Sequence, residues 1–313
     1  MEIGLLLPAG QAQLQAGGSA AALVDMAVNA ERTGFDSVWV GDSLSRARVE
    51  PLTLLTAVAQ ATEHITLGTA ALIPAYRNPA HAAVTISSLD LISGGRVVLG
   101  VGAGFPGFSE QEFELVGVHF KTRFSQLDDT VTLWRELWTG NPSSFHGKVL
   151  HYDWLPEVPR PARAGGPPVW LAGITPAALS RAGRLYDGWL PYPPDVADYA
   201  QGLATIREVA GARPVTPALF ATVFVDDDAE RGRKALDEYC RATYARPLDV
   251  IGRIQVMLTG EDLLTRLGQF AAAGAEHVLL RIAAVDPALV AEQLAKVAEL
   301  VPVLRRTLGT EGP

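Results

Sequence analysis

Two side chains that can act in proton transfer or hydrogen bonding follow an apolar run near the N-terminus. In Val38-Trp-Val-Gly-Asp-Ser43, the apolar residues are followed by Asp42 and Ser43. A carboxylate can serve as a general base, and a hydroxyl can donate a hydrogen bond to a reacting group. An aspartate in this position can equally cap the next turn. Asp42 and Ser43 are therefore the candidate catalytic residues.

The stretch from Ile65 to Pro74, ITLGTAALIP, begins with bulky residues and continues with Gly68, Thr69, Ala70 and Ala71. Small side chains at the end of a strand leave space in which a flat ring could lie. They can also simply let neighbouring strands approach each other. Three residues of this stretch are candidates for cofactor contact: Thr69, Ala70 and Ala71.

A glycine-rich end follows the next apolar run, Val97-Val-Leu-Gly-Val-Gly-Ala-Gly104. Its spacing is G-x-G-x-G, and Pro106 and Gly107 follow instead of a helix, so a dinucleotide fingerprint has little support. What remains is exposed backbone that a ligand can approach closely. Gly102, Ala103 and Gly104 are therefore candidate cofactor-binding residues.

A third candidate contact for a cofactor lies in Val169-Trp-Leu-Ala-Gly-Ile-Thr-Pro176. Thr175 is placed to cap a helix, and proline is favoured at the first helical position that follows. The free N–H groups and the positive dipole end of such a helix can bind a phosphate. The sequence thus adds Gly173, Ile174 and Thr175 as candidates, although a capped helix without a ligand remains the alternative.

Several chemistries find no support in the sequence. The six histidines are scattered and no H-E-x-x-H occurs, so no catalytic metal is expected. No G-x-S-x-G or P-loop motif occurs, and the few lysines lie off the predicted strand ends, which disfavours an aldolase-type Schiff base. A net charge of -8 argues against nucleic-acid binding. A single cysteine, Cys240, and the absence of a long apolar run predict a cytoplasmic protein without disulfides or membrane spans.

Amphipathic helices alternate with short apolar strands along the whole chain. Continuous Val, Leu and Ile runs indicate parallel strands that are buried on both faces. The fold class predicted is α/β: a (β/α)8 TIM barrel of one domain, residues 1–313, with an insertion over 105–168 at the C-terminal face of the strands. An open doubly wound sheet is the competing fold. The predicted strands are Ile3–Leu7, Ser37–Val40, Ile65–Thr69, Val97–Val101, Val169–Ala172, Gly188–Leu190, Ala218–Val225 and Val278–Ile282.

Taken in order, five segments resemble the luciferase-like monooxygenase family, which includes FMN- and deazaflavin-dependent oxidoreductases. They are GFDSVWVGD, ITLGTAALIPAYRNPAH, LDLISGGRVVLGVGAGF, PPVWLAGITPAALSRAGRLYDGWLP and AAGAEHVLLRI. The resemblance implies a barrel that binds FMN or the deazaflavin coenzyme, with a cis peptide between Ala70 and Ala71 behind the flavin ring. It also implies that residues 173–175 receive the cofactor phosphate, with Thr175 as a ligand, and that the backbone of residues 101–105 lines the ring.

One departure from the family concerns the end of the second strand. Many members have an Asp/Glu-His pair there, whereas this chain has Asp42 and Ser43, so imidazole proton transfer is absent. We expect a monooxygenase that uses reduced FMN and oxygen on a small organic substrate, with a separate reductase and, by analogy, a homodimer. The alternatives are a deazaflavin-dependent hydride-transfer dehydrogenase or reductase and a non-catalytic flavin-binding barrel. Substrate contacts are expected from residues 105–165.

Overall fold

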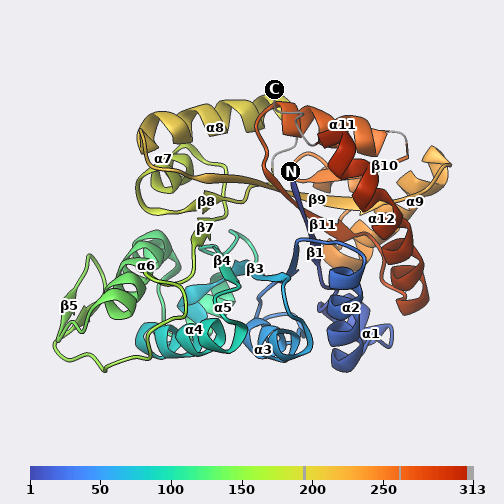
Figure 1. Ribbon diagram of the computed structural model, residues 1–313. Coiled ribbons are helices and arrows are strands. Elements are labelled where there is room, and N and C mark those ends of the chain that lie inside the picture. The colour runs from blue at the N-terminus through green and yellow to red at the C-terminus, as the bar shows by residue number, and fades with distance from the viewer. Residues whose placement is uncertain (193–194, 261, 309–313) are drawn as a thin grey trace.

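Eight parallel strands close into a barrel in the computed structural model, which describes residues 1–192, 195–260 and 262–308 (Figure 1). Around the ring, each strand pairs with the next and the last pairs with the first, which confirms the predicted TIM barrel. In this order they are β1 (Glu2–Leu6), β2 (Ser37–Val40), β3 (Thr66–Leu72), β4 (Val97–Val101), β7 (Val169–Leu171), β8 (Gly188–Trp189), β9 (Thr216–Phe224) and β11 (His277–Ile282).

The structure also contains strands that were not predicted. β10 (Val256–Thr259) pairs with the C-terminal half of β9, where Ala221–Phe224 extend beyond the short partner β8. A two-stranded antiparallel hairpin, β5 (Phe145–His146) and β6 (His151–Tyr152), lies outside the barrel.

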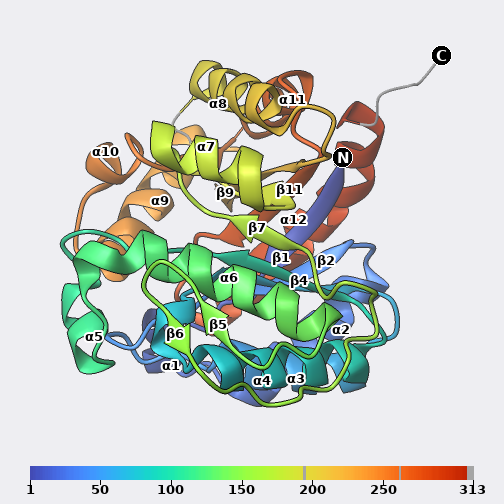
Figure 2. The ribbon, with the colours of Figure 1, turned by 90° about the vertical axis from the view of Figure 1, so that its left-hand side faces the viewer.

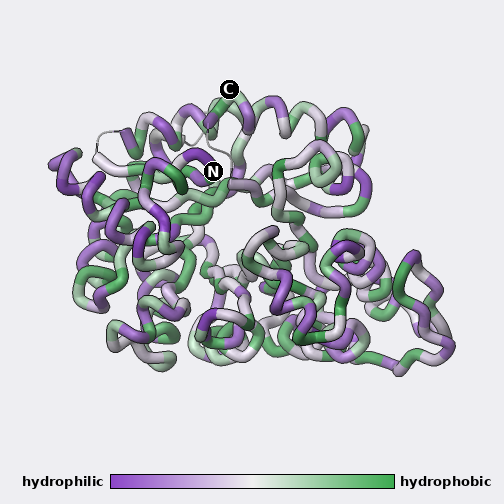
Figure 3. Tube along the Cα trace, turned by 180° about the vertical axis from the view of Figure 1, so that it is seen from behind, coloured by the Kyte–Doolittle hydropathy of each residue, from purple (hydrophilic) through white to green (hydrophobic). Residues whose placement is uncertain are grey.

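Helices surround the barrel, and hydrophobic and hydrophilic residues alternate along them (Figures 2 and 3). None of the helices in the described part of the chain is long and apolar enough to span a bilayer. The longer ones are α2 (Ala20–Arg32), α3 (Pro51–Ala61), α4 (Pro79–Ser93), α6 (Arg123–Thr139), α7 (Pro176–Leu185), α8 (Val196–Ala210), α9 (Ala229–Tyr244), α11 (Asp262–Ala272) and α12 (Pro287–Leu308). The short ones are α1 (Gln11–Gln15), α5 (Glu110–Leu115), α10 (Leu248–Ile251), η1 (Pro74–Tyr76) and η2 (Phe120–Thr122).

Large side chains fill the barrel interior and form the floor of its C-terminal mouth. The rings of Trp39 on β2 and Trp170 on β7 are 5.2 Å apart and belong to one buried cluster. Glycines on both neighbouring strands make room for Trp39, because a Cβ on Gly4 would lie 2.6 Å from its Nε1 and a Cβ on Gly68 would lie 2.1 Å from its ring. Phe220 on β9 belongs to the same cluster. Water is thereby excluded from the space below the strand ends.

The expected insertion over residues 105–168 is made of parts with different positions. Its first part, which includes α5, contacts the loop after β2 at the C-terminal face. α6 instead packs outside the barrel against α4, and Trp134 Nε1 donates a hydrogen bond of 2.9 Å to the Pro79 carbonyl. The last part runs past the C-terminal end of α4, where Arg163 N donates to Asp90 Oδ2 at 2.9 Å.

Candidate functional site

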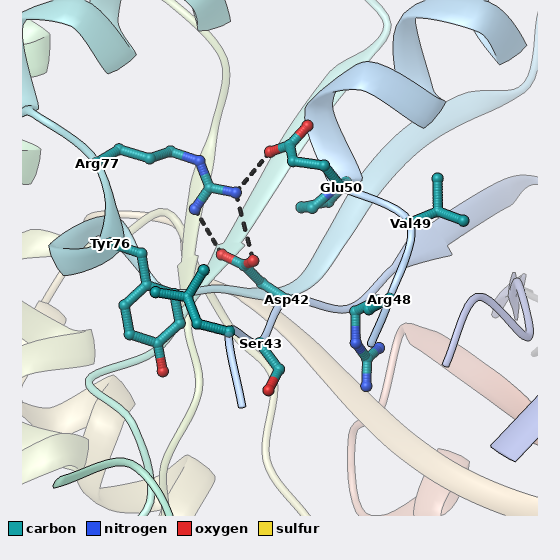
Figure 4. Close-up of a pocket in the computed structure, with 9 residues that line it drawn as sticks. Asp42, Ser43, Arg48, Val49, Glu50, Tyr76 and Arg77 are labelled. Atoms are coloured by element: carbon teal, nitrogen blue, oxygen red, sulfur yellow. Dashed lines mark hydrogen bonds and ion pairs between the residues drawn. The ribbon is translucent and has the colours of Figure 1, made fainter. Parts of the chain in front are cut away.

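Asp42 follows β2 at the mouth of the barrel, but both of its carboxylate oxygens are occupied (Figure 4). Arg77 donates to Oδ2 at 2.6 Å and to Oδ1 at 3.3 Å, and the backbone N–H of Ile73 donates to Oδ2 at 3.0 Å. Arg77 also pairs with Glu50 at 2.5 Å. Only 4% of the Asp42 side chain is exposed. Asp42 therefore ties the loop after β2 to the segment after β3, and no lone oxygen is left as an accessible base.

Ser43 is held by a residue that the sequence did not reveal. Its Oγ donates a hydrogen bond of 2.7 Å to Oε1 of Glu112 on α5. The backbone N–H groups of Leu44 and Ser45 donate to the same oxygen at 2.7 and 2.6 Å, and the Tyr76 hydroxyl donates to Oε2. One buried carboxylate thus fixes the loop after β2 and the tyrosine that follows β3.

The charge of Glu112 is stabilised by these donors. Burial opposes ionisation of the carboxyl group, but the hydrogen bonds from Tyr76, Ser45 and Ser43 outweigh it and lower the pKa of Glu112 to about 2. For Tyr76, burial and the hydrogen bond to Glu112 both raise the pKa of the phenol. At neutral pH the site therefore contains a glutamate anion and a protonated tyrosine.

A cavity of about 290 Å³ opens between the loop after β2 and η1 (Figure 4). This volume is at the lower end of the range for small-molecule sites. Asp42 and Ser43, the two predicted catalytic residues, both line it. The complete lining is Asp42, Ser43, Leu44, Arg48, Val49, Glu50, Pro51, Tyr76 and Arg77.

The small residues of three neighbouring strands meet beside this region. A Cβ on Gly102 would lie 3.4 Å from Ile73 Cδ1, 3.5 Å from Ala71 Cβ and 3.9 Å from Ala172 Cβ, so a methyl group would just fill the space. The peptide bond between Ala70 and Ala71 is cis, as the family resemblance implied. The register between β3 and β4 shifts there, between Thr69 and Leu72. The ends of β3, β4 and β7 therefore form a wall of backbone and methyl groups.

Two of the predicted cofactor contacts have structural roles that the sequence did not indicate. Thr69 is fully buried, and its Oγ1 donates a hydrogen bond of 2.9 Å to the Gly100 carbonyl, which joins β3 to β4. Gly104 has a φ of +74° and lies against α5, because a Cβ there would be 2.8 Å from the Phe113 ring. Ala103, between the two glycines, is partly buried against the core.

The segment of Gly173, Ile174 and Thr175 lies next to the wall. β7 pairs with β4, and Ala172 N donates to the Val101 carbonyl at 2.8 Å. Thr175 caps α7, with its Oγ1 accepting from Ala178 N at 3.3 Å. Gly173 has a φ of +136°, and Ile174 and Thr175 are exposed. The N-terminal turn of α7 is therefore open to an anion beside the wall.

These features fit a planar ring with a phosphorylated tail. The wall offers backbone and small side chains with Ile73 beside them, and the adjacent helix end offers an N–H donor and a hydroxyl. Among the described residues, no group of three or more His, Cys, Asp or Glu side chains is placed to hold a metal ion.

Nearly the whole chain matches one protein family. The family described as luciferase-like monooxygenase matches residues 1–304. The chain belongs to this family.

Two characterised members are similar in sequence. The chain is 37% identical over 184 residues to the F420-dependent glucose-6-phosphate dehydrogenase of Amycolatopsis mediterranei. This alignment covers 54% of this chain and 52% of that protein. It is 33% identical over 224 residues to the F420-dependent hydroxymycolic acid dehydrogenase of Mycobacterium tuberculosis, with 68% and 61% covered. The chain spans about half the length of the first of these relatives.

A solved structure shows the same fold. An F420-dependent secondary alcohol dehydrogenase in complex with an F420–acetone adduct superposes with a TM-score of 0.80. The alignment covers 97% of this chain and 99% of that chain at 22% sequence identity. At this identity the likeness supports the barrel architecture.

Proposed function

We propose that this protein is an oxidoreductase that binds the deazaflavin coenzyme F420 and transfers a hydride between it and a small organic substrate. The observation that carries the proposal is the similarity at 37% and 33% identity to two dehydrogenases that are both named as F420-dependent. The sequence alone favoured FMN and oxygen. These relatives move the preference to the deazaflavin alternative.

The cofactor site proposed is the wall at the ends of β3, β4 and β7. Ala71 and Gly102 would face the ring, and the hydroxyl of Thr175 with the N–H of Ala177 would hold the phosphate, since Pro176 has no N–H and Ala178 N is bonded to Thr175 Oγ1. When bound, the deazaflavin supplies the hydride chemistry, and the protein supplies binding, orientation and electrostatics. The packed floor of Trp39 and Trp170 keeps water from entering from below.

Ser43 takes a defined orientation in this proposal. Its hydroxyl proton is committed to Glu112, so its oxygen lone pairs are free to accept a hydrogen bond from a substrate hydroxyl. Glu112, with its pKa lowered to about 2, is a weak proton acceptor. We therefore assign Glu112 to positioning Ser43, Ser45 and Tyr76, and Ser43 to orienting the substrate.

Binding titrations test the cofactor. We expect purified protein to bind the deazaflavin coenzyme saturably in anaerobic fluorescence titrations, at least tenfold more tightly than FMN. Reduction of the bound deazaflavin by an alcohol would then be followed by its absorbance. If neither cofactor binds saturably, the proposal is wrong, and a preference for FMN would replace it with the second candidate.

That second candidate is an FMN-dependent monooxygenase, and the description of the matching family favours it. It would need reduced FMN from a separate reductase. Oxygen consumption that depends on reduced FMN and on an organic substrate would support it. A protein that binds either cofactor but turns over no substrate would be the non-catalytic barrel.

A further inference from the structure

A buried hydrogen-bond donor lies at the mouth of the barrel without a partner. It is Nε of Arg48, in the loop after β2, and it makes no hydrogen bond to the described residues. The carboxylates of Asp42 and Glu50 line the same cavity as Arg48, but both pair with Arg77, at 2.6 and 2.5 Å. An unpartnered buried donor is costly, so this arginine favours a ligand that accepts hydrogen bonds and carries negative charge.

The guanidinium group of Arg48 lies over backbone at the ends of two neighbouring strands. A Cβ on Gly41, which follows β2, would lie 2.5 Å from Nη1, and a Cβ on Gly10, in the segment after β1, would lie 3.8 Å from Nη2. The same point at Gly41 is 3.3 Å from the carbonyl oxygen of Ala70, whose bond to the next residue is cis. The charged end of Arg48 and the wall at the end of β3 therefore flank one glycine.

The side chains of Arg48, Ser43 and Tyr76 line one cavity and point the same way in the close-up view (Figure 4). Ser43 and Tyr76 both donate their hydroxyl protons to Glu112, so their oxygen lone pairs remain as acceptors. Arg48 contributes the opposite kind of group, because a guanidinium group only donates. The cavity thus combines acceptors for a substrate hydroxyl with a cation beside the wall.

Arg48 stays charged in this position. Burial lowers the pKa of its guanidinium group, and the charge of Asp42 acts in the opposite direction. Because the ordinary value is 12.5, the side chain remains a cation at neutral pH.

A ring that accepts a hydride changes its charge. In the proposed reaction an alcohol carbon loses a hydride, the hydroxyl proton leaves to water, and a carbonyl compound remains. The hydride carries two electrons and one proton, so the ring gains one negative charge. A cation held beside the ring stabilises that charge, and nearby charges are one means by which proteins tune a flavin-type cofactor.

We propose that Arg48 holds the negative charge that the cofactor ring gains on reduction. The inference rests on the proposed function for the presence of the ring against the wall, and it adds a role for one residue: Arg48 favours the reduced cofactor over the oxidised one. Arginine suits this task because its planar group donates two parallel hydrogen bonds to neighbouring acceptors.

The topology separates Arg48 from the site proposed for the cofactor phosphate. Arg48 follows β2, whereas Thr175 follows β7, and β3 and β4 lie between these two strands in the barrel. The wall at the ends of β3, β4 and β7 thus has the arginine at one edge and the open helix end at the other. A ring on the wall would therefore reach Arg48 with the edge that lies away from its phosphorylated tail.

Anaerobic titrations with oxidised and reduced coenzyme F420, repeated with FMN, test the inference. The ratio of the two dissociation constants isolates the effect of the charge that reduction adds. We expect Arg48→Gln to weaken binding of the reduced form tenfold or more and to change binding of the oxidised form by less than twofold. Each tenfold change in this ratio corresponds to about 30 mV in the potential of a two-electron couple, so spectroelectrochemistry should show a lower midpoint potential for the bound cofactor.

Arg48→Lys tests whether the charge is the cause. We expect this variant to keep the ratio of dissociation constants within threefold of the wild type, and a ratio as low as that of Arg48→Gln would contradict the inference. Both variants are expected to fold, since Nε of Arg48 has no partner to lose within the part of the chain that the structure describes, and thermal unfolding checks this.

The matched control is Arg32→Gln, which removes the same charge from an exposed position at the end of α2, just before β2 begins. We expect its ratio of dissociation constants to stay within twofold of the wild type. If Arg32→Gln changes the ratio as much as Arg48→Gln does, the effect comes from net charge and the inference is wrong.

The remaining outcomes separate this inference from the proposed function. Equal weakening of the oxidised and reduced forms in Arg48→Gln would overturn the inference, because the arginine would then hold another part of the cofactor or the fold. Saturable binding of coenzyme F420 with an unchanged ratio would remove the role of Arg48 and leave the proposed function in place. If neither cofactor binds saturably to the wild-type chain, both are wrong.

Discussion

The hydroxyl of Ser43 donates a hydrogen bond of 2.7 Å to Oε1 of Glu112, although 69 positions separate the two residues in the chain. The family resemblance leads us to expect a histidine at the position of Ser43. The hydrogen bond gives it a fixed orientation, and Glu112 binds the next two backbone N–H groups as well. The neutral hydroxyl of Ser43 thus stands in place of a titratable imidazole, on a loop that Glu112 holds through three hydrogen bonds.

We predict that Glu112→Ala lowers stability by about 2–4 kcal/mol, because two backbone N–H groups and the Tyr76 hydroxyl lose a charged acceptor. Urea unfolding at pH 7 measures the change. Glu112→Gln keeps an acceptor oxygen and is expected to recover part of the loss. The neighbouring Glu114→Ala, on the same helix, should change stability by less than about 0.5 kcal/mol. Equal losses in the Glu112 and Glu114 variants would contradict the role assigned to Glu112.

The pH dependence of stability follows from the same carboxylate. The pKa of Glu112 is lowered to about 2 in the folded protein from an ordinary value of 4.5, so the folded state favours the ionised form. Its contribution is fully present above pH 4.5 and is lost as the pH falls toward 2. The stability of the wild type should therefore fall more steeply over this interval than that of Glu112→Gln. Parallel curves in urea titrations at several pH values would contradict the assignment.

The strands of the barrel were predictable because each is a local apolar run. Ser37–Val40 and Val97–Val101 have the same bounds in the structure as in the sequence prediction. β10 was missed. It is a short strand whose partner, β9, ends more than thirty positions earlier in the chain. Periodicity reports which residues are buried, and it carries no information about such distant pairing.

The candidate site was predictable only in part. The wall and the helix end lie at strand ends, where residue type and position together indicate a ligand. Glu112 could not be distinguished from its acidic neighbours Glu110 and Glu114, since only the fold brings it to Ser43.

The wall at Gly102 gives a prediction about cofactor affinity. In Gly102→Val, the added methyl groups would press against Ile73, Ala71 and Ala172. Overpacking of this kind costs about 1–3 kcal/mol, so the proposed cofactor should bind roughly tenfold more weakly or worse. Gly140→Val, at the end of α6 and remote from the mouth, is the control for volume. Unchanged affinity in a folded Gly102→Val protein would show that the ring binds elsewhere.

The helix cap at Thr175 gives a prediction that separates two roles of one hydroxyl. Thr175→Ala removes the acceptor for Ala178 N and should lower stability by about 1 kcal/mol. If the same turn binds the cofactor phosphate, the variant should weaken FMN binding more than riboflavin binding, because riboflavin lacks the phosphate. Thr175→Ser should restore both properties. Equal weakening for the two flavins would leave the capping role and remove the phosphate role.

Asp42 gives a prediction that distinguishes an anchor from a base. Asp42→Asn removes the charge that holds Arg77 and weakens the acceptor for Ile73 N. The free energy of unfolding should therefore fall by about 2–3 kcal/mol. This loss is smaller than the full cost of breaking a buried ion pair, because Arg77 still pairs with Glu50. Loss of a general base would instead lower kcat by about 10²–10⁴ and remove an inflection from its pH profile. An anchor leaves the shape of that profile unchanged. Glu50→Gln, which removes the exposed partner of Arg77, should cost less than about 1 kcal/mol. A stable Asp42→Asn protein whose pH profile has lost an inflection would therefore establish Asp42 as the base.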